Sequence, residues 1–176
     1  MVTLHALKYS RATRVLWLLA DLGQPCRRID YDRTESFRAP DALSQVHPLG
    51  KSPVIEDDGA QIAESATILR YLVDKYGDDS HTPPKGTPAY WQHEAMLDYV
   101  ESSFAGAALP VILPAFRGKP VPDEARAALD RKDVAGVASL GAAAGAQLND
   151  LLGATGAARP ALAAMLGRGV PVLPLL

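Results

Sequence analysis

Short apolar runs alternate with longer segments that carry apolar residues at helical spacing through the first half of the chain. Residues 2–6 and 27–31 are runs of strand length, and both are bounded by polar or Gly-Pro corners. Between them, residues 14–22 show a helical pattern. It follows Ser10, a residue that can cap a helix, and it stops at Gly23, which can end one. The pattern predicts a strand, a helix and a second, parallel strand, which is the start of a βαβ unit.

A proline, a tight turn and an amphipathic segment predict the rest of this domain. Residues 39–46 favour a short helix or an irregular segment. Pro53 then opens a short apolar run, and a proline is tolerated at the first residue of a strand because it has no N–H to give to a ladder. An Asp57-Asp58-Gly59 turn leads to a second short run, and a helix is expected from Glu64 to about Tyr76. The order βαβαββα predicts an α/β domain with a thioredoxin-like layout.

A polar, proline-rich segment at residues 79–88 separates this domain from a second periodic region. From residue 88 to about residue 116, apolar side chains fall at helical spacing with acidic residues between them. We expect Pro110 and Pro114 to bend or end this helix. A further helical region is expected at residues 122–152. The predicted organisation is a domain at residues 1–78, a linker at 79–88 and an all-helical domain at 89–176.

Composition and charge argue against several classes of function. The 176 residues are 48% hydrophobic, enough for a core, and a formal net charge of −2 provides no basic field for nucleic acid. The single cysteine, Cys26, excludes an internal disulfide framework, and the four histidines lack the spacing of metal ligands. We find neither an export leader nor an apolar run of membrane-spanning length. The sequence therefore predicts a cytoplasmic protein with no metal site, no nucleic-acid partner and no membrane association.

The corner at Pro53 and the expected helix start at Glu64 suit a peptide-like ligand. An extended peptide can bond to backbone groups at a strand, and a helix N-terminus suits a carboxylate. This pattern resembles the glutathione transferase family, whose thioredoxin-like half carries a Pro-Val-Leu/Ile strand followed by a Glu/Gln-Ser helix start. The resemblance implies that Ser52 and Val54 flank a cis-proline that docks the cysteinyl backbone of glutathione. It also implies that Glu64 and Ser65 hold the γ-glutamyl end.

The amino-terminal corner carries a second resemblance to the same family. Residues 10–19, Ser-Arg-Ala-Thr-Arg-Val-Leu-Trp-Leu-Leu, resemble the first helix of bacterial and fungal glutathione transferases. Ser10 has the spacing from Arg14 of the serine-using, theta-like branch, which implies that its hydroxyl stabilises the glutathione thiolate. Tyr9 is the alternative donor, and a plain helix cap is the alternative role of Ser10. Lys51 is expected either to pair with the glycyl carboxylate or to be a solvated loop lysine.

Transferase chemistry depends on the protonation state of the glutathione thiol. A thiol has a pKa near about 8.5, so most of it is protonated and unreactive at neutral pH. Lowering this pKa by about two units requires about 2.7 kcal/mol of preferential thiolate stabilisation. One charge-assisted hydrogen bond from a hydroxyl, together with a helix N-terminus, supplies most of that free energy.

The helical half carries the weaker part of the resemblance. In the family, the fourth helix corresponds to the segment at residues 88–116 of this chain. That helix lines the dimer contact and the acceptor site, so the resemblance implies a homodimer. The aromatic residues implied for the acceptor site are Tyr99, Phe104 and Phe116, and packing in the core is the alternative role of each. Residues 160–166 resemble a late family helix with Met165 in place of a tryptophan. Between these segments, residues 141–146 and 153–158 are rich in Gly and Ala where relatives have a capping box, so we expect a shortened or degenerate helical domain.

The residues and the resemblance together predict a glutathione transferase. The reaction expected is conjugation or reduction of small apolar electrophiles, with glutathione as co-substrate and no other cofactor. The alternative is a non-catalytic transferase-like protein that binds a ligand or a partner, which the atypical helical half favours. Thiol–disulfide exchange through a protein cysteine is disfavoured, because no cysteine lies at the Ser10 corner.

Overall fold

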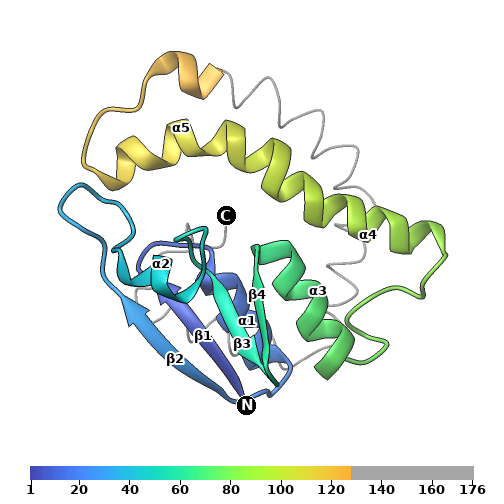
Figure 1. Ribbon diagram of the computed structural model, residues 1–176. Helices are drawn as coiled ribbons and strands as arrows, with labels where there is room; N and C mark the ends of the chain where they lie inside the picture. Colours follow the sequence, from blue (N-terminus) through green and yellow to red (C-terminus); the bar gives the residue numbers. More distant parts are fainter. Residues whose placement is uncertain (128–176) are drawn as a thin grey trace. The chain divides into compact units, whose positions relative to one another are not determined.

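The computed structural model describes residues 1–127 of the chain. These residues divide into two compact units, Met1–His81 and residues 82–127 (Figure 1). Each unit is described by itself below. The predicted helices beyond residue 127, together with Met165 and the two tracts rich in Gly and Ala, lie outside the described residues.

The first unit is built around a four-stranded sheet, and its helices lie between the strands and after them in the sequence. Its strands stand in the order β2-β1-β3-β4. The pair β1/β2 is parallel, and the pairs β1/β3 and β3/β4 are antiparallel. The elements in chain order are β1 (Val2–Leu7), α1 (Ala12–Asp21), β2 (Cys26–Tyr31), α2 (Ala42–Val46), β3 (Val54–Asp57), β4 (Ala60–Ala63) and α3 (Ser65–Tyr76). This arrangement confirms the predicted βαβαββα order and the thioredoxin-like fold.

The hydrophobic core lies between the sheet and the helices α1 and α3, which pack against each other (Figure 1). Alternate residues of β1 enter this core because successive side chains of a strand point to opposite faces. Each helix contributes residues spaced three and four apart, which form one apolar stripe. The buried members of the cluster include Val2, Leu4 and Ala6 of β1, Val15, Leu18 and Leu19 of α1, Ile55 of β3, and Ile68 and Leu72 of α3.

The hairpin between β3 and β4 closes where the sequence predicted a turn. Asp58 and Gly59 both have positive φ angles, 47° and 82°. A two-residue loop of this kind matches the twist of the strands that it joins, and Asp-Gly is a preferred pair for it. The turn fixes the register in which Val54 faces Ala63, so the start of β3 lies beside the end of β4.

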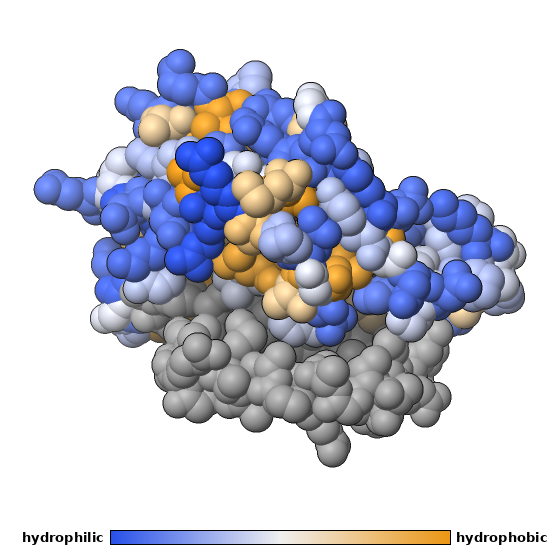
Figure 2. Space-filling view, turned by 90° about the horizontal axis from the view of Figure 1, so that it is seen from below, coloured by the Kyte–Doolittle hydropathy of each residue, from blue (hydrophilic) through white to orange (hydrophobic). Residues whose placement is uncertain are grey.

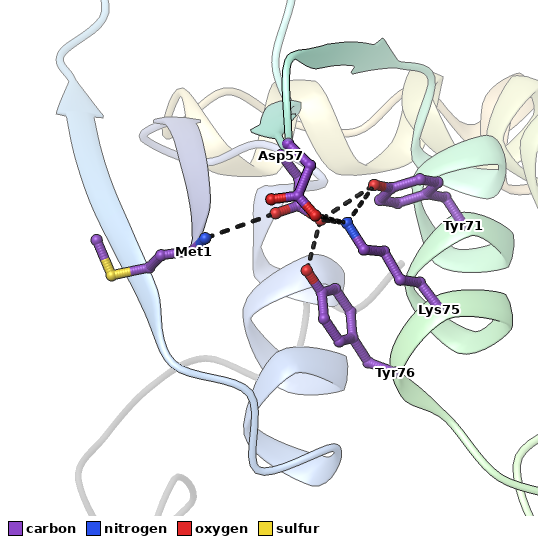
Figure 3. A network of polar contacts seen from close by, with 6 residues as sticks. Met1, Asp57, Tyr71, Lys75 and Tyr76 are labelled. Atoms are coloured by element: carbon purple, nitrogen blue, oxygen red, sulfur yellow. Dashed lines mark hydrogen bonds and ion pairs between the residues drawn. The ribbon is translucent and has the colours of Figure 1, made fainter.

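A buried carboxylate ties the end of β3 to helix α3 (Figure 3). The side chain of Asp57 is fully buried, and Lys75 donates to its Oδ2 at 2.7 Å. The hydroxyls of Tyr76 and Tyr71 donate to the same oxygen at 2.5 and 3.0 Å, and the amino group of Met1 lies 3.8 Å from Oδ1. Burial raises the pKa of the Asp57 carboxyl, but the hydrogen bonds from Lys75, Tyr76 and Tyr71 outweigh burial, so this pKa lies below its usual value.

The second unit is helical in its described part. It consists of α4 (Pro88–Tyr99), a π-helical turn η1 (Val100–Phe104) and α5 (Ala105–Phe116). The Thr87 hydroxyl accepts from the Tyr90 N–H at 3.2 Å and caps α4. The expected helix is present, but Pro110 and Pro114 lie inside α5 rather than at its end.

The bend in this helical segment lies before the prolines. The segments Pro88–Phe104 and Ala108–Pro114 are inclined at 57° to each other. A proline clashes with the carbonyl group four residues earlier, which for Pro110 is that of Gly106, within the break. The helix therefore bends one turn ahead of the proline and then continues.

Two absences within residues 1–127 concern membrane-spanning helices and metal sites. No single helix is long and apolar enough to cross a membrane, although the bent pair of helices at residues 88–104 and 108–114 meets the test by length and composition together. Within the same residues, no group of three or more His, Cys, Asp or Glu side chains could hold a metal ion.

One face of the molecule shows apolar residues gathered within a mostly hydrophilic surface (Figure 2). The large apolar side chains that are exposed among the described residues are Met1, Tyr9, Trp17, Leu49, Trp91 and Leu109. Exposure of single apolar residues is ordinary for folded proteins, so we assign these residues no role on this ground.

Candidate functional site

Three chain segments meet at one end of the sheet. Val54 pairs with His5 of β1 and with Ala63 of β4, so the residue before β3 and the residue after β4 lie at the same end. β1 runs antiparallel to β3, and its carboxyl end therefore leads into the same corner. The register thus brings together the regions of Ser10, Ser52-Pro53 and Glu64-Ser65, which the sequence had placed in one site.

The hydroxyls of Ser10 and Ser52 lie 3.2 Å apart, although the two residues are 42 positions apart in the sequence. The Ser52 hydroxyl also accepts from the Leu7 N–H at 2.9 Å and donates to the His5 carbonyl oxygen at 2.9 Å. The Ser10 hydroxyl accepts from the Ala12 N–H at 3.2 Å, in the first turn of α1. Ser10 therefore satisfies the N–H of the first residue of α1, although the N-cap residue is Arg11, and its hydroxyl also lies beside Ser52 of the proline corner.

The proline corner is tightly built. The Ser52–Pro53 bond is cis, and the side chains of Pro53 and Val54 are buried. Gly50 precedes the corner with φ 57°, and a Cβ placed there would stand 2.6 Å from the Ser44 Oγ. The positive φ favours glycine at this position, and any larger residue would also have to displace the Ser44 side chain of α2. Lys51, which lies between Gly50 and Ser52, is exposed.

Helix α3 starts directly beside this corner. Glu64 has φ 69° and ψ 118°, an uncommon conformation for a residue other than glycine, and its carbonyl accepts the Ile68 N–H at 2.9 Å. Ser65, the first residue of the helix, is buried, whereas the Glu64 side chain is exposed. Non-glycine residues in such conformations concentrate at ligand sites, and the amino end of α3 provides a positive dipole end for an anion.

Tyr9 lies at the same corner but turns to a different neighbour. Its φ is 56°, its side chain is 49% exposed, and its ring stacks on Phe37 with the centroids 6.2 Å apart. The Ser10 hydroxyl, in turn, lies within hydrogen-bond distance of Ser52.

Arg33 is a residue of this corner that the sequence did not indicate. Its guanidinium donates to the carbonyl oxygens of Lys8 at 2.8 Å, Tyr9 at 2.8 Å and Phe37 at 3.0 Å. These bonds connect the loop after β2 to the loop that carries Ser10. A lone arginine after a strand gives no sequence signal for such a role, because its partners are backbone groups of a distant loop.

The residues predicted for the acceptor site lie in the second unit. Tyr99 ends α4 and Phe104 ends η1, in the second unit. Phe116 ends α5, and its side chain lies outside the described residues. The described part of the chain therefore does not show the expected acceptor site.

The cysteine and the histidine of the sheet lie away from the reactive corner. Cys26 pairs with Val2 at the start of β1, the opposite end from Ser10, and its burial raises the pKa of its thiol despite Arg28 nearby. The His5 ring is buried and its Nδ1 lies 2.8 Å from the Tyr31 hydroxyl. Only the backbone of His5 takes part in the corner, so neither the Cys26 thiol nor the His5 ring supplies a nucleophile or base there.

Comparisons with known proteins identify the first unit. Residues 1–74 match the family model described as Glutathione S-transferase, N-terminal domain. The chain is 41% identical over 103 residues to Glutathione S-transferase 3 of Schizosaccharomyces pombe, covering 58% of this chain and 42% of that protein. It is 34% identical over 125 residues to Glutathione S-transferase theta-1 of Bos taurus, covering 58% of this chain and 51% of that protein.

A solved structure agrees with these sequence relatives. A glutathione S-transferase from Actinobacillus pleuropneumoniae is similar with a TM-score of 0.62 and 33% identity, over 76% of this chain and 62% of that one. The chain spans about half, or less, of the length of the two curated relatives that it matches. The likeness therefore concerns the thioredoxin-like unit and the beginning of the helical region.

Proposed function

The chain belongs to the glutathione S-transferase family through residues 1–74, and from this premise we propose that it is a glutathione transferase whose Ser10 stabilises the thiolate. The proposed reaction is attack of the glutathione thiolate on an electrophilic carbon, or on a peroxide, of a small apolar acceptor. The single observation that carries the proposal is the contact between the hydroxyls of Ser10 and Ser52, 3.2 Å apart, beside the cis Ser52–Pro53 bond.

The proposed pose of glutathione follows the order of the three segments at this end of the sheet. The cysteinyl backbone would lie along the corner formed by Ser52, Pro53 and Val54, and the γ-glutamyl end would lie at Glu64 and Ser65. Support comes from the register, which sets the start of β3 beside the end of β4. An exposed lysine before the corner, Lys51, would then face the glycyl carboxylate from solvent.

The catalytic contribution proposed for Ser10 is thermodynamic. Its hydroxyl would donate to the sulfur and favour the thiolate over the thiol, which requires about 2.7 kcal/mol for a pKa lowered by about two units. The amino end of α1, next to Ser10, adds a positive dipole end to this donation. No metal or prosthetic group enters this proposal, and glutathione is the co-substrate.

Replacement of Ser10 by alanine tests the proposal. Ser10→Ala should lower turnover of a chlorinated aromatic acceptor at neutral pH by about 10- to 30-fold, because the thiolate fraction falls when the pKa of the thiol rises by about two units. Glutathione affinity, measured by calorimetry, should change little. Ser80→Ala is the control, because it removes a serine hydroxyl from an exposed turn at Asp78. Unchanged turnover in Ser10→Ala would reject the role of Ser10.

The rival donor is tested in the same assay. Tyr9→Phe removes a phenol whose ring stacks on Phe37, and we expect turnover close to that of the unmodified protein. A larger loss in Tyr9→Phe than in Ser10→Ala would transfer the role to Tyr9.

A second candidate function is a transferase-like protein that binds glutathione without catalysis. It is favoured by the atypical sequence of the helical half, with its tracts rich in Gly and Ala at residues 141–146 and 153–158. Retention on immobilised glutathione, together with no turnover on a panel of aryl halides and hydroperoxides, would support this function over the enzyme. Absence of glutathione binding would reject both. A homodimer is a further proposal from family membership, and sedimentation that shows only monomer would contradict it.

A further inference from the structure

The Ser52 hydroxyl takes part in three hydrogen bonds but has only one proton. It donates to the His5 carbonyl oxygen at 2.9 Å, and this carbonyl can only accept. It accepts from the Leu7 N–H at 2.9 Å, which can only donate. The third contact, 3.2 Å to the Ser10 hydroxyl, must then be donated by Ser10.

This assignment has a consequence for the hydroxyl that is proposed to serve glutathione. The Ser10 oxygen already accepts from the Ala12 N–H at 3.2 Å, and the Ser10 proton points at Ser52. A hydroxyl can donate only one hydrogen bond at a time. Ser10 can therefore donate to a sulfur only if it gives up its bond to Ser52 or if Ser52 reverses that bond.

We propose that Ser52 is a positioning residue that reverses its hydrogen bond to Ser10 when the thiolate is bound. The Ser52 hydroxyl rotates its proton from the His5 carbonyl to the Ser10 oxygen, and the Ser10 hydroxyl rotates its own proton to the sulfur. Two O–H bonds turn, no proton is transferred and no charge is created by the switch. The inference rests on the proposed function, since it requires Ser10 to donate to glutathione.

The rearranged network leaves both serine oxygens satisfied. Ser10 would accept from Ser52 and from the Ala12 N–H while donating to sulfur, and Ser52 would keep the Leu7 N–H. Because donation to a hydroxyl polarises its O–H bond, Ser52 would make Ser10 a stronger donor to the thiolate. The bond to His5 is the one that is lost, and its carbonyl belongs to a strand that is paired on both sides.

The test is the pKa of glutathione bound to the full chain, followed by the ultraviolet absorbance of the thiolate during a pH titration at saturating glutathione. The proteins are the unmodified chain, Ser10→Ala, Ser52→Ala and the double variant, with Ser80→Ala as control. We expect Ser52→Ala to raise the pKa of the bound thiol by about 0.2 to 0.6, since cooperative hydrogen bonding changes a bond by about 10–30% and the whole effect proposed for Ser10 is about two pKa units. The double variant should equal Ser10→Ala, because Ser52 acts through Ser10.

A matched pair guards against loss of the corner itself. Ser52→Thr keeps a hydroxyl, and valine has nearly the same shape as threonine but no hydroxyl. Only Ser52→Val should therefore raise the pKa of the bound thiol. Equal values for this pair, or shifts of Ser10→Ala and Ser52→Ala that add in the double variant, would overturn the inference. An unchanged pKa in Ser10→Ala would instead overturn the proposed function, so the two failures are distinguishable.

Discussion

Replacement of Tyr76 by phenylalanine isolates one bond to the buried Asp57 carboxylate. The Tyr76 hydroxyl lies 2.5 Å from Asp57 Oδ2, and its ring packs against the core cluster. Phenylalanine keeps the ring and removes only the donor. A hydrogen bond to a charged group contributes about 1.5–3 kcal/mol, so Tyr76→Phe should lower the free energy of unfolding by about 2 kcal/mol at pH 7.

The pH dependence of this difference identifies the carboxylate as the acceptor. The pKa of Asp57 is below its usual value in the folded chain, despite burial, because Lys75, Tyr76 and Tyr71 donate to it. A lowered folded pKa gives stability that is present above the unfolded pKa, about 3.9, and is lost as the pH falls through the folded value. The difference between the unmodified protein and Tyr76→Phe should therefore shrink as the pH falls through the lowered folded pKa of Asp57 and the carboxyl becomes neutral.

Urea denaturation of both proteins at pH 7 and at pH 3 measures these differences. Tyr90→Phe, which removes a phenol from the second unit and outside this cluster, is the matched control and should change the free energy of unfolding little. Equal stability of Tyr76→Phe and the unmodified protein at pH 7 would refute the assigned strength of the bond. A difference of the same size at both pH values would refute the carboxylate as its acceptor.

Two further predictions concern the side-chain bonds of Arg33 beside the site and the glycine of the β3–β4 hairpin. Arg33→Lys keeps the charge but replaces three separate donor nitrogens by one, which cannot reach the carbonyl oxygens of Lys8, Tyr9 and Phe37 together. The catalytic efficiency of conjugation should therefore fall about 5- to 10-fold, the equivalent of about 1 kcal/mol of loop positioning. Unchanged kinetics would mean that these bonds do not position Ser10. Gly59→Ala places a Cβ at φ 82° and should lower the free energy of unfolding by about 1–2 kcal/mol in urea titrations, whereas Gly106→Ala, in helix α5 and with open space around its Cβ, should be neutral or stabilising.

The elements that the sequence predicted are those whose signals are local. The Asp-Gly pair specifies its own turn, Gly77 follows the last residue of α3, and the short apolar run at residues 2–6 marks a strand that is buried in the sheet. The predicted chemistry at Ser10 and Pro53 came from the family resemblance, and the register of β1, β3 and β4 now gives the reason why these positions meet. The local pattern of residues was enough to predict the helices and strands, but it did not predict which of them lie in contact.

The features that the sequence missed depend on distant partners. Asp57 was expected only as a turn residue, yet its carboxylate collects donors from α3, 14 to 19 positions away. Arg33 acts on carbonyl groups, which every residue has, so its side chain alone could not reveal its targets. For Pro110 and Pro114 the sequence left open whether they bend or end the helix; the helix bends one turn ahead of Pro110 and continues through both prolines, because a proline disturbs the turn before it.

The proposed activity has two requirements that depend on different parts of the chain. Capture and ionisation of glutathione require the corner at Ser10, Ser52 and Pro53, all within the residues that match the family model. Choice of acceptor is expected to require aromatic residues of the second unit. Thiolate absorbance reports on the first requirement without any acceptor, and turnover reports on both. A full-chain protein that ionises bound glutathione but turns over no electrophile would therefore assign the defect to the helical unit and leave the role of the serine pair intact.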